Sequence, residues 1–184
     1  YIYQGEELGM TNVRFESIED YRDGDSIRFY EDMHVDHQRL NHEDAMRAIY
    51  IKGRDNARTP MQWNAGENAG FTTGTPWLKL NPRYTEINAE SELADPDSVF
   101  YHYRDLIKLR REHPIVLTGE YRLLDEEDDQ VYAYLRVNSD EDATATGERA
   151  LLVVANFTDD TVQLNYAGGN LDSVVLTNSQ ALSP

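Results

Sequence analysis

Residues 52–80 constrain the fold of this chain more than any other segment. These 29 residues have little apolar periodicity, and they include four glycines, two prolines, both tryptophans of the chain and two close arginines, Arg54 and Arg58. A long segment without regular structure inside a compact protein is usually functional or disordered. Disorder is disfavoured because four large apolar side chains here need burial. They are Met61, Trp63, Phe71 and Trp77.

The backbone of a buried loop must form hydrogen bonds, and the polar side chains beside the arginines can supply them. We therefore expect Asp55, Asn56 and Thr59 to bond locally. Chemistry alone leaves two interpretations open. The segment is either an active-site wall that presents a cation to a polar ligand, or a packed loop between two domains.

Charge limits the partners of this chain. Its formal net charge is −17, which argues against nucleic acid or an anionic membrane surface as a partner. Three lysines stand against fourteen arginines and 34 acids, whereas ordinary soluble domains use lysine heavily. Concentrated salt screens the self-repulsion of such a surface. The composition predicts a halophilic source with a salt-rich cytoplasm, and an acidic mesophilic protein is the alternative.

The chain has no cysteine, which excludes a disulfide-stapled module, cysteine-ligated zinc and thiol catalysis. It opens at Tyr1 inside an apolar-aromatic segment, and no apolar run approaches the roughly 20 residues of a membrane span. We expect a cytoplasmic piece of a longer protein, without a signal peptide.

Residues 1–3 are aromatic and β-branched, and they predict the end of a buried strand. Two acids follow between glycines, Glu6 and Glu7. At the carboxyl end of a strand, such acids face the ligand side of a parallel α/β sheet or barrel. We favour the simpler role, in which both accept hydrogen bonds from the loop backbone.

Several helices are expected before the β-rich part. The spacing from Ser17 to Asp20 predicts a capping box and a short helix interrupted near Gly24, and the polar residues 21–25 can point into a cleft. Asn41 predicts the start of a helix that runs to about Lys52 and stops at Gly53. Three nearby histidines are interpreted as surface residues, because their spacing suits no metal helix. They are His34, His37 and His42.

Asp95 and Pro96 predict the start of the best-defined helix, which Pro114 stops. From Ile115 onwards the apolar period becomes alternating, and this predicts strands. The expected strands are residues 121–124, 131–137, 150–157, 162–166 and 174–177, with charged hairpin tips at 125–129 and 138–146. A run of strands after helices indicates a separate small β domain.

Four motifs carry a family resemblance. They are YIYQGEELGMTNV, the YRD segment, KGRDNARTPMQW and NAGFTTGTPWLKLNP. Together they resemble the C-terminal third of α-glucosidases of the oligo-1,6-glucosidase type, in the α-amylase superfamily of glycoside hydrolases. The resemblance implies the C-terminal part of a (β/α)8 TIM barrel over residues 1–114, in which residues 1–3 are the eighth strand and 96–113 the last helix. An antiparallel β-sandwich domain over residues 115–184, truncated at its end, would follow.

The resemblance also implies what this chain lacks. Retaining glycosidases need two carboxyl groups about 5–5.5 Å apart, one as nucleophile and one as acid/base. In this family those two carboxylates and a third that stabilises the transition state follow strands four, five and seven, upstream of Tyr1. We therefore name no catalytic residue here, and no metal or cofactor is expected. The fragment alone is expected to be inactive, and its partners are a small oligosaccharide and the upstream part of the same barrel.

Two substrate-binding residues follow from the resemblance. Arg58 matches the arginine that contacts the terminal glucose at the subsite before the cleaved bond, where it pairs with an upstream Asp and closes the pocket. A planar guanidinium can bind a carboxylate and sugar hydroxyls at once. Arg54 is expected to support the loop. Asp25 stands where relatives have a Glu that contacts the leaving-side glucose and favours α-1,6 linkages, and its shorter side chain leaves the linkage preference open.

The resemblance thus implies an exo-acting, retaining α-glucosidase that acts on short α-linked oligosaccharides of the isomaltose, maltose or sucrose type. Sucrose-isomerising, transglycosylating and trehalose- or trehalose-6-phosphate-hydrolysing enzymes share much of this region. A non-catalytic alternative is the heavy subunit of amino-acid transporters, which keeps the fold as a binding partner. A stand-alone β-sandwich carbohydrate binder is the third alternative, and the barrel-like segments disfavour it.

Overall fold

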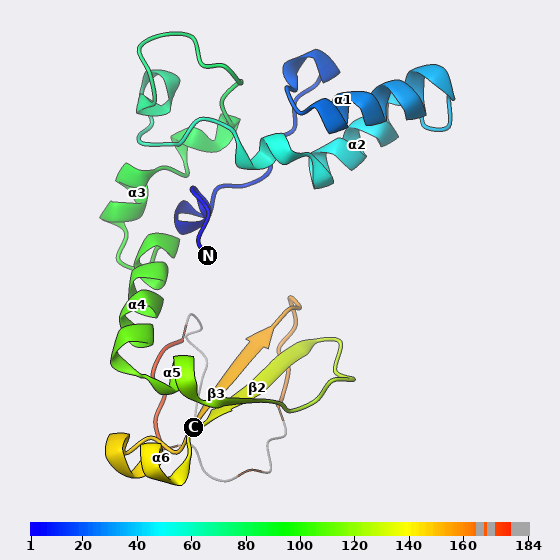
Figure 1. Cartoon of the computed structure of the whole chain (residues 1–184). Coiled ribbons are helices and arrows are strands. Elements are labelled where there is room, and N and C mark those ends of the chain that lie inside the picture. The colour runs from blue at the N-terminus through cyan, green and yellow to red at the C-terminus, as the bar shows by residue number, and fades with distance from the viewer. Residues whose placement is uncertain (165–167, 169–171, 178–184) are drawn as a thin grey trace. The chain divides into compact units, whose positions relative to one another are not determined.

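The computed structural model describes residues 1–164, 168 and 172–177 (Figure 1). The chain divides into two compact units, Tyr1–Tyr103 and Arg104–Pro184. The first unit is built of helices and loops, and the second contains the one sheet found among the described residues. None of the helices in these residues is long and apolar enough to cross a membrane.

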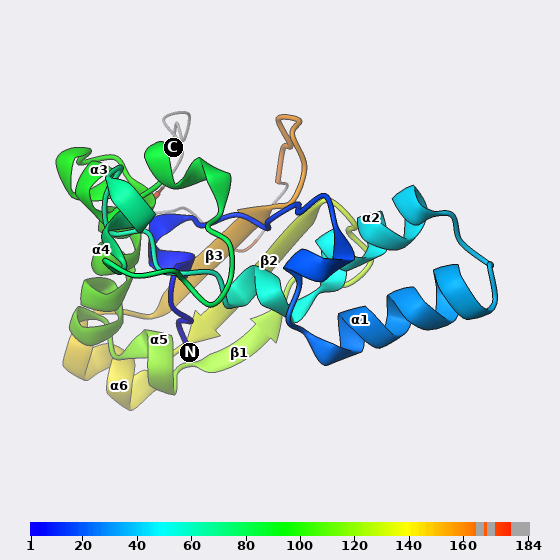
Figure 2. The ribbon, with the colours of Figure 1, turned by 90° about the horizontal axis from the view of Figure 1, so that it is seen from above.

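Two helices form the ordered centre of the first unit. Helix α1 (Gly24–Tyr30) continues into a π-helical turn (Glu31–Asp36), and α2 (His42–Lys52) runs back beside it, as both ribbon views show (Figures 1 and 2). The Asn41 side chain accepts a hydrogen bond from the Asp44 N–H at 2.8 Å, which confirms the predicted cap. The core on this helix pair consists of Val13, Phe15, Tyr21, Met46, Ile49 and Leu78.

Gly53 ends α2 as predicted, but for a reason of space rather than conformation. Its φ of −63° is open to any residue. A Cβ at this position would lie 2.7 Å from the carbonyl oxygen of Ile49 and 3.2 Å from the hydroxyl of Ser26. The close approach lets the chain turn directly from α2 into the short 3-10 turn Arg54–Ala57.

Two N-terminal predictions were wrong. Residues 1–3 form no strand, and their side chains are exposed. A strand needs a neighbour to pair with, and the only strands among the described residues pair with one another in the second unit. The helix predicted to break near Gly24 instead begins there, because Asp23 caps it. Ser17 caps only a 3-10 turn (Ile18–Asp20), accepting from Glu19 rather than from Asp20.

The residues after the long segment form more helix than predicted. A 3-10 turn (Pro82–Thr85) is followed by α3 (Ala89–Ala94), which a capping box between Asn88 and Ser91 starts. Helix α4 begins at Val99 and ends at Glu112, so the predicted start at Asp95 was too early. Asp95 instead ends α3.

The long segment has no regular structure beyond two 3-10 turns, Arg54–Ala57 and Glu67–Gly70. Its large aromatic side chains are not buried, contrary to expectation. The exposed fractions are 51% for Trp63, 45% for Phe71 and 55% for Trp77. Leu78 is the apolar anchor, at 2% exposed in the core of the first unit.

In its described residues, the second unit contains most of α4, a three-stranded antiparallel sheet and two short helices. The strands are β1 (Glu120–Leu123), β2 (Val131–Val137) and β3 (Ala150–Asn156), in the order β1-β2-β3. Helix α5 (Ile115–Thr118) packs on the sheet, where Ile115, Val131 and Ala133 are buried. The predicted strands of this sheet are confirmed to within one residue at each end.

Two other predictions for this unit were wrong. Residues 138–146 are not a simple hairpin tip, because Ser139 caps a helix, α6 (Asp140–Thr146), with three acids in its first turn. Residues 162–164 and 174–177 form no strand. Residues 165 and 166, the rest of one expected strand, lie outside the described residues.

Candidate functional site

A buried carboxylate, Asp23, organises the polar centre of the first unit. Its side chain is 3% exposed and caps α1. It accepts hydrogen bonds from the Ser26 hydroxyl at 2.8 Å and from the Arg54 side chain, with Nε at 3.0 Å and Nη2 at 2.6 Å. The backbone N–H groups of Arg54 and Asp25 also donate to it. This carboxylate therefore ties α1 to the turn after α2.

The protonation state of Asp23 follows from these donors. Burial raises the pKa of its carboxyl, but the hydrogen bonds from Arg54, Ser26 and two backbone N–H groups outweigh burial. They hold that pKa well below its usual range. Asp23 is therefore an anion at neutral pH.

A second buried carboxylate, Asp55, reinforces the first. Its side chain is 0% exposed, and its Oδ2 accepts from the backbone N–H groups of Arg22 at 2.6 Å and Asp23 at 2.8 Å. Asn56 accepts from the Val13 N–H at 3.0 Å in the same way. These partners are 32 to 43 residues away, so the expectation of local bonding was wrong for Asp55. It is confirmed in part for Asn56, whose amide also donates to the Tyr50 carbonyl, six residues away, at 2.9 Å. The Thr59 hydroxyl is buried and has no hydrogen-bond partner in the described part of the chain.

The two arginines of the segment differ in how they are held. Arg54 is bound to Asp23 and also pairs with Asp25, which fits the predicted support of the loop. The backbone N–H of Arg58 donates to the Asp55 carbonyl at 3.0 Å, but its guanidinium donates no hydrogen bond among the described residues. Its Nη1 lies 3.8 Å from Asp23 Oδ1 and 3.6 Å from Asp55 Oδ1, and its side chain is 37% exposed. The two carboxylates therefore balance the positive charge of the guanidinium, and its N–H groups are still available to a ligand.

Asp25, the other predicted binding residue, lies one turn from the same centre. One of its oxygens pairs with Arg28 and the other with Arg54. Its side chain is 57% exposed. The structure thus brings Asp25, Arg54 and Arg58 into one cluster around Asp23.

The N-terminal loop and the long segment also meet. Residues 3–6 and 10–12 line a hollow of about 200 Å³ together with Asn56, Ala57, Thr59 and Met61. Glu7 accepts from the Gly5 N–H at 2.8 Å, and Glu6 accepts from the Tyr3 N–H at 3.1 Å. The role of these two acids as acceptors for the loop backbone is confirmed.

Sequence reasoning missed Asp23 as the centre of the site and Asp55 as its long-range partner. The only signal was that each acid lies within two residues of an arginine and a glycine, in YRDGD and KGRDN. That pattern also fits a solvated turn. It carries no information that the two turns meet.

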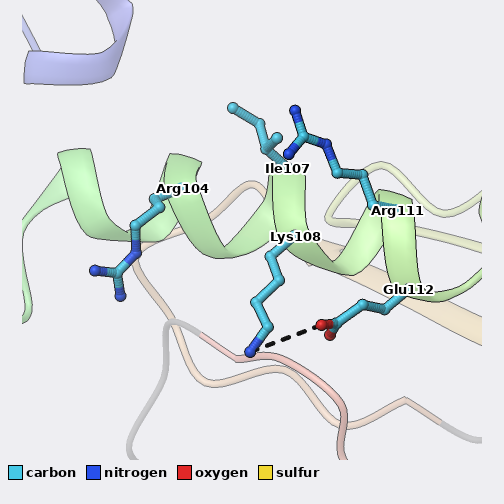
Figure 3. Close-up of a pocket in the computed structure, with 5 residues that line it drawn as sticks. All are labelled: Arg104, Ile107, Lys108, Arg111 and Glu112. Atoms are coloured by element: carbon cyan, nitrogen blue, oxygen red, sulfur yellow. Dashed lines mark ion pairs between the residues drawn. The ribbon is translucent and has the colours of Figure 1, made fainter.

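A second hollow, of about 330 Å³, lies along α4 and was not predicted. Five residues of this helix line it: Arg104, Ile107, Lys108, Arg111 and Glu112. Figure 3 shows Ile107 and Arg111 on one side of the helix and Lys108 and Glu112 on the other, with Lys108 Nζ 3.9 Å from Glu112 Oε1. The cations do not converge on one point, so this hollow lacks the geometry of an anion site.

The histidines also form no metal site. His34 and His42 pack around the Tyr30 ring, and the Tyr30 hydroxyl lies 2.8 Å from His42 Nδ1. Within the described ranges, no group of three or more His, Cys, Asp or Glu side chains could hold a metal ion.

Comparison with known proteins bears on this cluster. The family profile described as "Alpha amylase, catalytic domain" matches residues 1–119. The oligo-1,6-glucosidase of Parageobacillus thermoglucosidasius is 50% identical over 161 residues, which make up 88% of this chain and 27% of that protein. The oligo-1,6-glucosidase of Halalkalibacterium halodurans is 52% identical over 157 residues, or 85% of this chain and 26% of that protein.

Solved structures give a matching result. Trehalose-6-phosphate hydrolase from Bacillus licheniformis superposes with a TM-score of 0.86 at 44% identity, over 100% of this chain and 32% of that one. Isomaltulose synthase from Protaminobacter rubrum has a TM-score of 0.76 at 44% identity, over 86% of this chain and 27% of that one. The chain thus spans between a quarter and a third of the length of these relatives.

Proposed function

Because the chain belongs to the α-amylase family of glycoside hydrolases, we propose that it is the C-terminal part of a retaining, exo-acting α-glucosidase, called the parent enzyme below. Its substrates are short α-linked gluco-oligosaccharides of the isomaltose, maltose or sucrose type. The observation that carries this proposal is Arg58, whose guanidinium is half-exposed, flanked by buried carboxylates and free of hydrogen bonds among the described residues.

In this proposal Arg58 binds the terminal glucose at the subsite before the cleaved bond. Its planar fork bonds sugar hydroxyls and an upstream carboxylate together, which closes the pocket and restricts the enzyme to chain ends. The catalytic nucleophile and acid/base lie upstream of this chain. The described residues therefore shape and charge the pocket, and they do not cleave the bond.

Substitution of Arg58 tests the proposal. In the parent enzyme, Arg58→Ala should cost on the order of 2–5 kcal/mol of transition-state stabilisation, because it leaves buried carboxylate unpaired and removes the donors to the sugar. The measurement is kcat/KM on maltose and isomaltose. Turnover within about a factor of three of the unsubstituted enzyme, a loss well below 1 kcal/mol, would refute the role of Arg58.

We further propose that Asp25 faces the leaving-side glucose. Its exposed carboxylate lies beside Arg54, so it can reach a sugar placed next to Arg58. Asp25→Glu should raise the ratio of isomaltose to maltose hydrolysis, since the longer side chain restores the reach of a Glu. An unchanged ratio means that Asp25 does not contact that sugar. Asp105→Glu is the matched control, because Asp105 lies outside the cluster, on α4.

Relatives with other reactions define the alternatives. Among the similar proteins are a trehalose-6-phosphate hydrolase and an isomaltulose synthase. The parent enzyme is therefore to be incubated separately with isomaltose, sucrose and trehalose 6-phosphate, and its products separated by chromatography. Glucose from isomaltose supports the proposed hydrolysis, whereas isomaltulose from sucrose identifies an isomerase. If the parent enzyme converts none of the three substrates, a non-catalytic relative is the remaining interpretation.

The architecture of the parent enzyme follows from the same family membership. We propose that residues 1–114 complete a (β/α)8 barrel whose upstream part is their partner, and that the β1–β3 sheet belongs to a C-terminal antiparallel β-sandwich domain. The three-stranded sheet after α5 supports the second point.

The charge of the chain supports a cytoplasmic enzyme from a halophile that binds neither nucleic acid nor membrane. With 34 acids and three lysines, its surface repels itself, and concentrated salt would screen that repulsion. The melting temperature of the parent enzyme should rise between low and molar KCl. A melting temperature that falls over the same series would contradict the halophilic source.

A further inference from the structure

Within the described part of the chain, two ion pairs and no hydrogen bond hold the guanidinium of Arg58. Two buried carboxylate oxygens, Asp55 Oδ1 and Asp23 Oδ1, lie 3.6 and 3.8 Å from its Nη1, which is beyond hydrogen-bond distance and within the reach of a strong charge interaction. Such an arrangement orients a cation and leaves its N–H donors unused.

The two carboxylates are not equivalent. Both oxygens of Asp23 accept hydrogen bonds from other groups, chiefly Arg54 and Ser26. Asp55 Oδ2 is also occupied, by two backbone N–H groups, but Asp55 Oδ1 is buried and accepts no hydrogen bond from the residues that the structure describes. A buried carboxylate oxygen without a partner is costly, so this atom needs a nearby positive charge. The nearest cation is Arg58.

We propose that Asp55 is the positioning residue for Arg58. Its Oδ2 is fixed to the backbone of residues 22 and 23, and its Oδ1 holds the guanidinium by charge alone, so that the N–H groups of Arg58 point to the substrate. The proposal rests on the proposed sugar-binding role of Arg58, and it adds a residue that touches no substrate. Because Asp55 is fixed to the backbone beside Asp23, it also fixes the orientation of the Arg58 guanidinium.

A double-mutant cycle in the parent enzyme tests this proposal. Asp55→Asn keeps the size of the side chain and an oxygen for the two N–H groups, but it removes the charge and turns an amide towards Arg58. We expect kcat/KM on isomaltose to fall on the order of tenfold to a hundredfold, as for other misplacements of substrate-binding groups. In an Arg58→Ala background, Asp55→Asn should cause no further loss, because its effect passes through Arg58.

Controls separate this effect from a general loss of structure. Asp20→Asn removes another carboxylate of the first unit, which pairs with Lys79 at 2.7 Å, and it should leave kcat/KM unchanged in both backgrounds. Circular dichroism and melting curves report whether each variant folds. If Asp55→Asn does not fold, Asp55→Ser takes its place in the cycle, because its smaller side chain admits a water molecule to the two N–H groups.

The outcomes are distinct. If Arg58→Ala leaves kcat/KM unchanged, the proposed function fails. If Arg58→Ala lowers kcat/KM and Asp55→Asn then lowers it by the same factor in both backgrounds, Asp55 acts independently of Arg58 and the positioning role is overturned. It is equally overturned if Asp55→Asn leaves kcat/KM unchanged while Arg58→Ala lowers it.

Discussion

The two halves of the long segment are held in different ways. Residues 53–62 are bonded to distant parts of the first unit, through Asp55 to residues 22 and 23 and through Asn56 to Val13. The side-chain hydrogen bonds of residues 63–77, the aromatic half, stay inside that stretch, as between Asn68 and the carbonyl groups of Thr72 and Gly74. The comparison teaches that polar contacts fix the cation-bearing half, whereas the aromatic half carries its rings on the surface.

Removal of Asp23 should have the largest effect, because the bonds of the first half converge on it. Asp23→Ala leaves the buried Ser26 hydroxyl and backbone N–H groups without an acceptor. We expect the free energy of unfolding of the parent enzyme to fall on the order of 3 kcal/mol, at the low end for a broken buried pair because Arg54 remains half in water. Urea unfolding measures the loss. A loss no greater than that of Asp20→Asn would erase the contrast between the halves.

Crowding at Gly53 should have the next largest effect. The methyl group of Gly53→Ala meets the Ile49 carbonyl at 2.7 Å, and this contact is with rigid backbone. We expect a loss of about 1–3 kcal/mol, typical of overpacking. Gly74→Ala, in the aromatic half, is the matched control, because its Cβ would meet only the Thr72 hydroxyl at 3.7 Å. Similar melting temperatures for the two variants would show that the first half is not the tighter one.

Acid should weaken the first half in a defined direction. The pKa of Asp23 is lower in the folded protein than in the unfolded chain, so its stabilisation is complete above the unfolded value of about 4 and is lost as the pH falls towards the folded value. The difference in urea midpoint between the parent enzyme and Asp23→Asn should therefore shrink as the pH falls from about 5 to 2. A difference in urea midpoint that stays constant with pH would show that the charge of Asp23 does not contribute to stability.

The aromatic half should give the smallest effect on stability. The 184-residue chain by itself should bind a hydrophobic dye or aggregate, because Trp63, Phe71 and Trp77 are about half exposed. Trp77→Ser should lower the dye fluorescence and change the stability of the chain by no more than about 0.5 kcal/mol. A monomer that binds no dye would show that these rings are covered.

The sequence predicted the elements whose signals are local. Helix α2 begins after Asn41 and ends before Gly53, as expected, and the alternating pattern located β2 and β3. Caps and periodicity can be predicted because they depend only on neighbouring residues. Residues 1–3 were mispredicted because a strand depends on a partner elsewhere. Residues 138–146 contain a cap at Ser139 with acids behind it, but an acidic stretch between two predicted strands also fits a hairpin tip.

The candidate site was predicted in its exposed residues and missed in its buried ones. Arg58 and Asp25 came from a motif, and their roles stay predictions. The pairing of Asp55 with residues 22 and 23 could not be predicted, because a buried hydrogen bond across 32 residues leaves no periodic trace in the sequence. Such contacts depend on the packing of α1 against α2, which is a property of the fold.

Residues 64–74 form a loop whose hydrogen bonds are mostly internal, so its length and sequence can change without disturbing the rest of the first unit. Asn68, Ala69 and Gly70 turn with positive φ, and Ala69 returns its carbonyl group to the N–H groups of Trp63 and Asn64 at 2.9 and 3.2 Å. A loop that closes on its own base can be lengthened at little entropic cost. Directed evolution can therefore vary the loop between two buried ends, Gln62 and Leu78, and leave the cation in place.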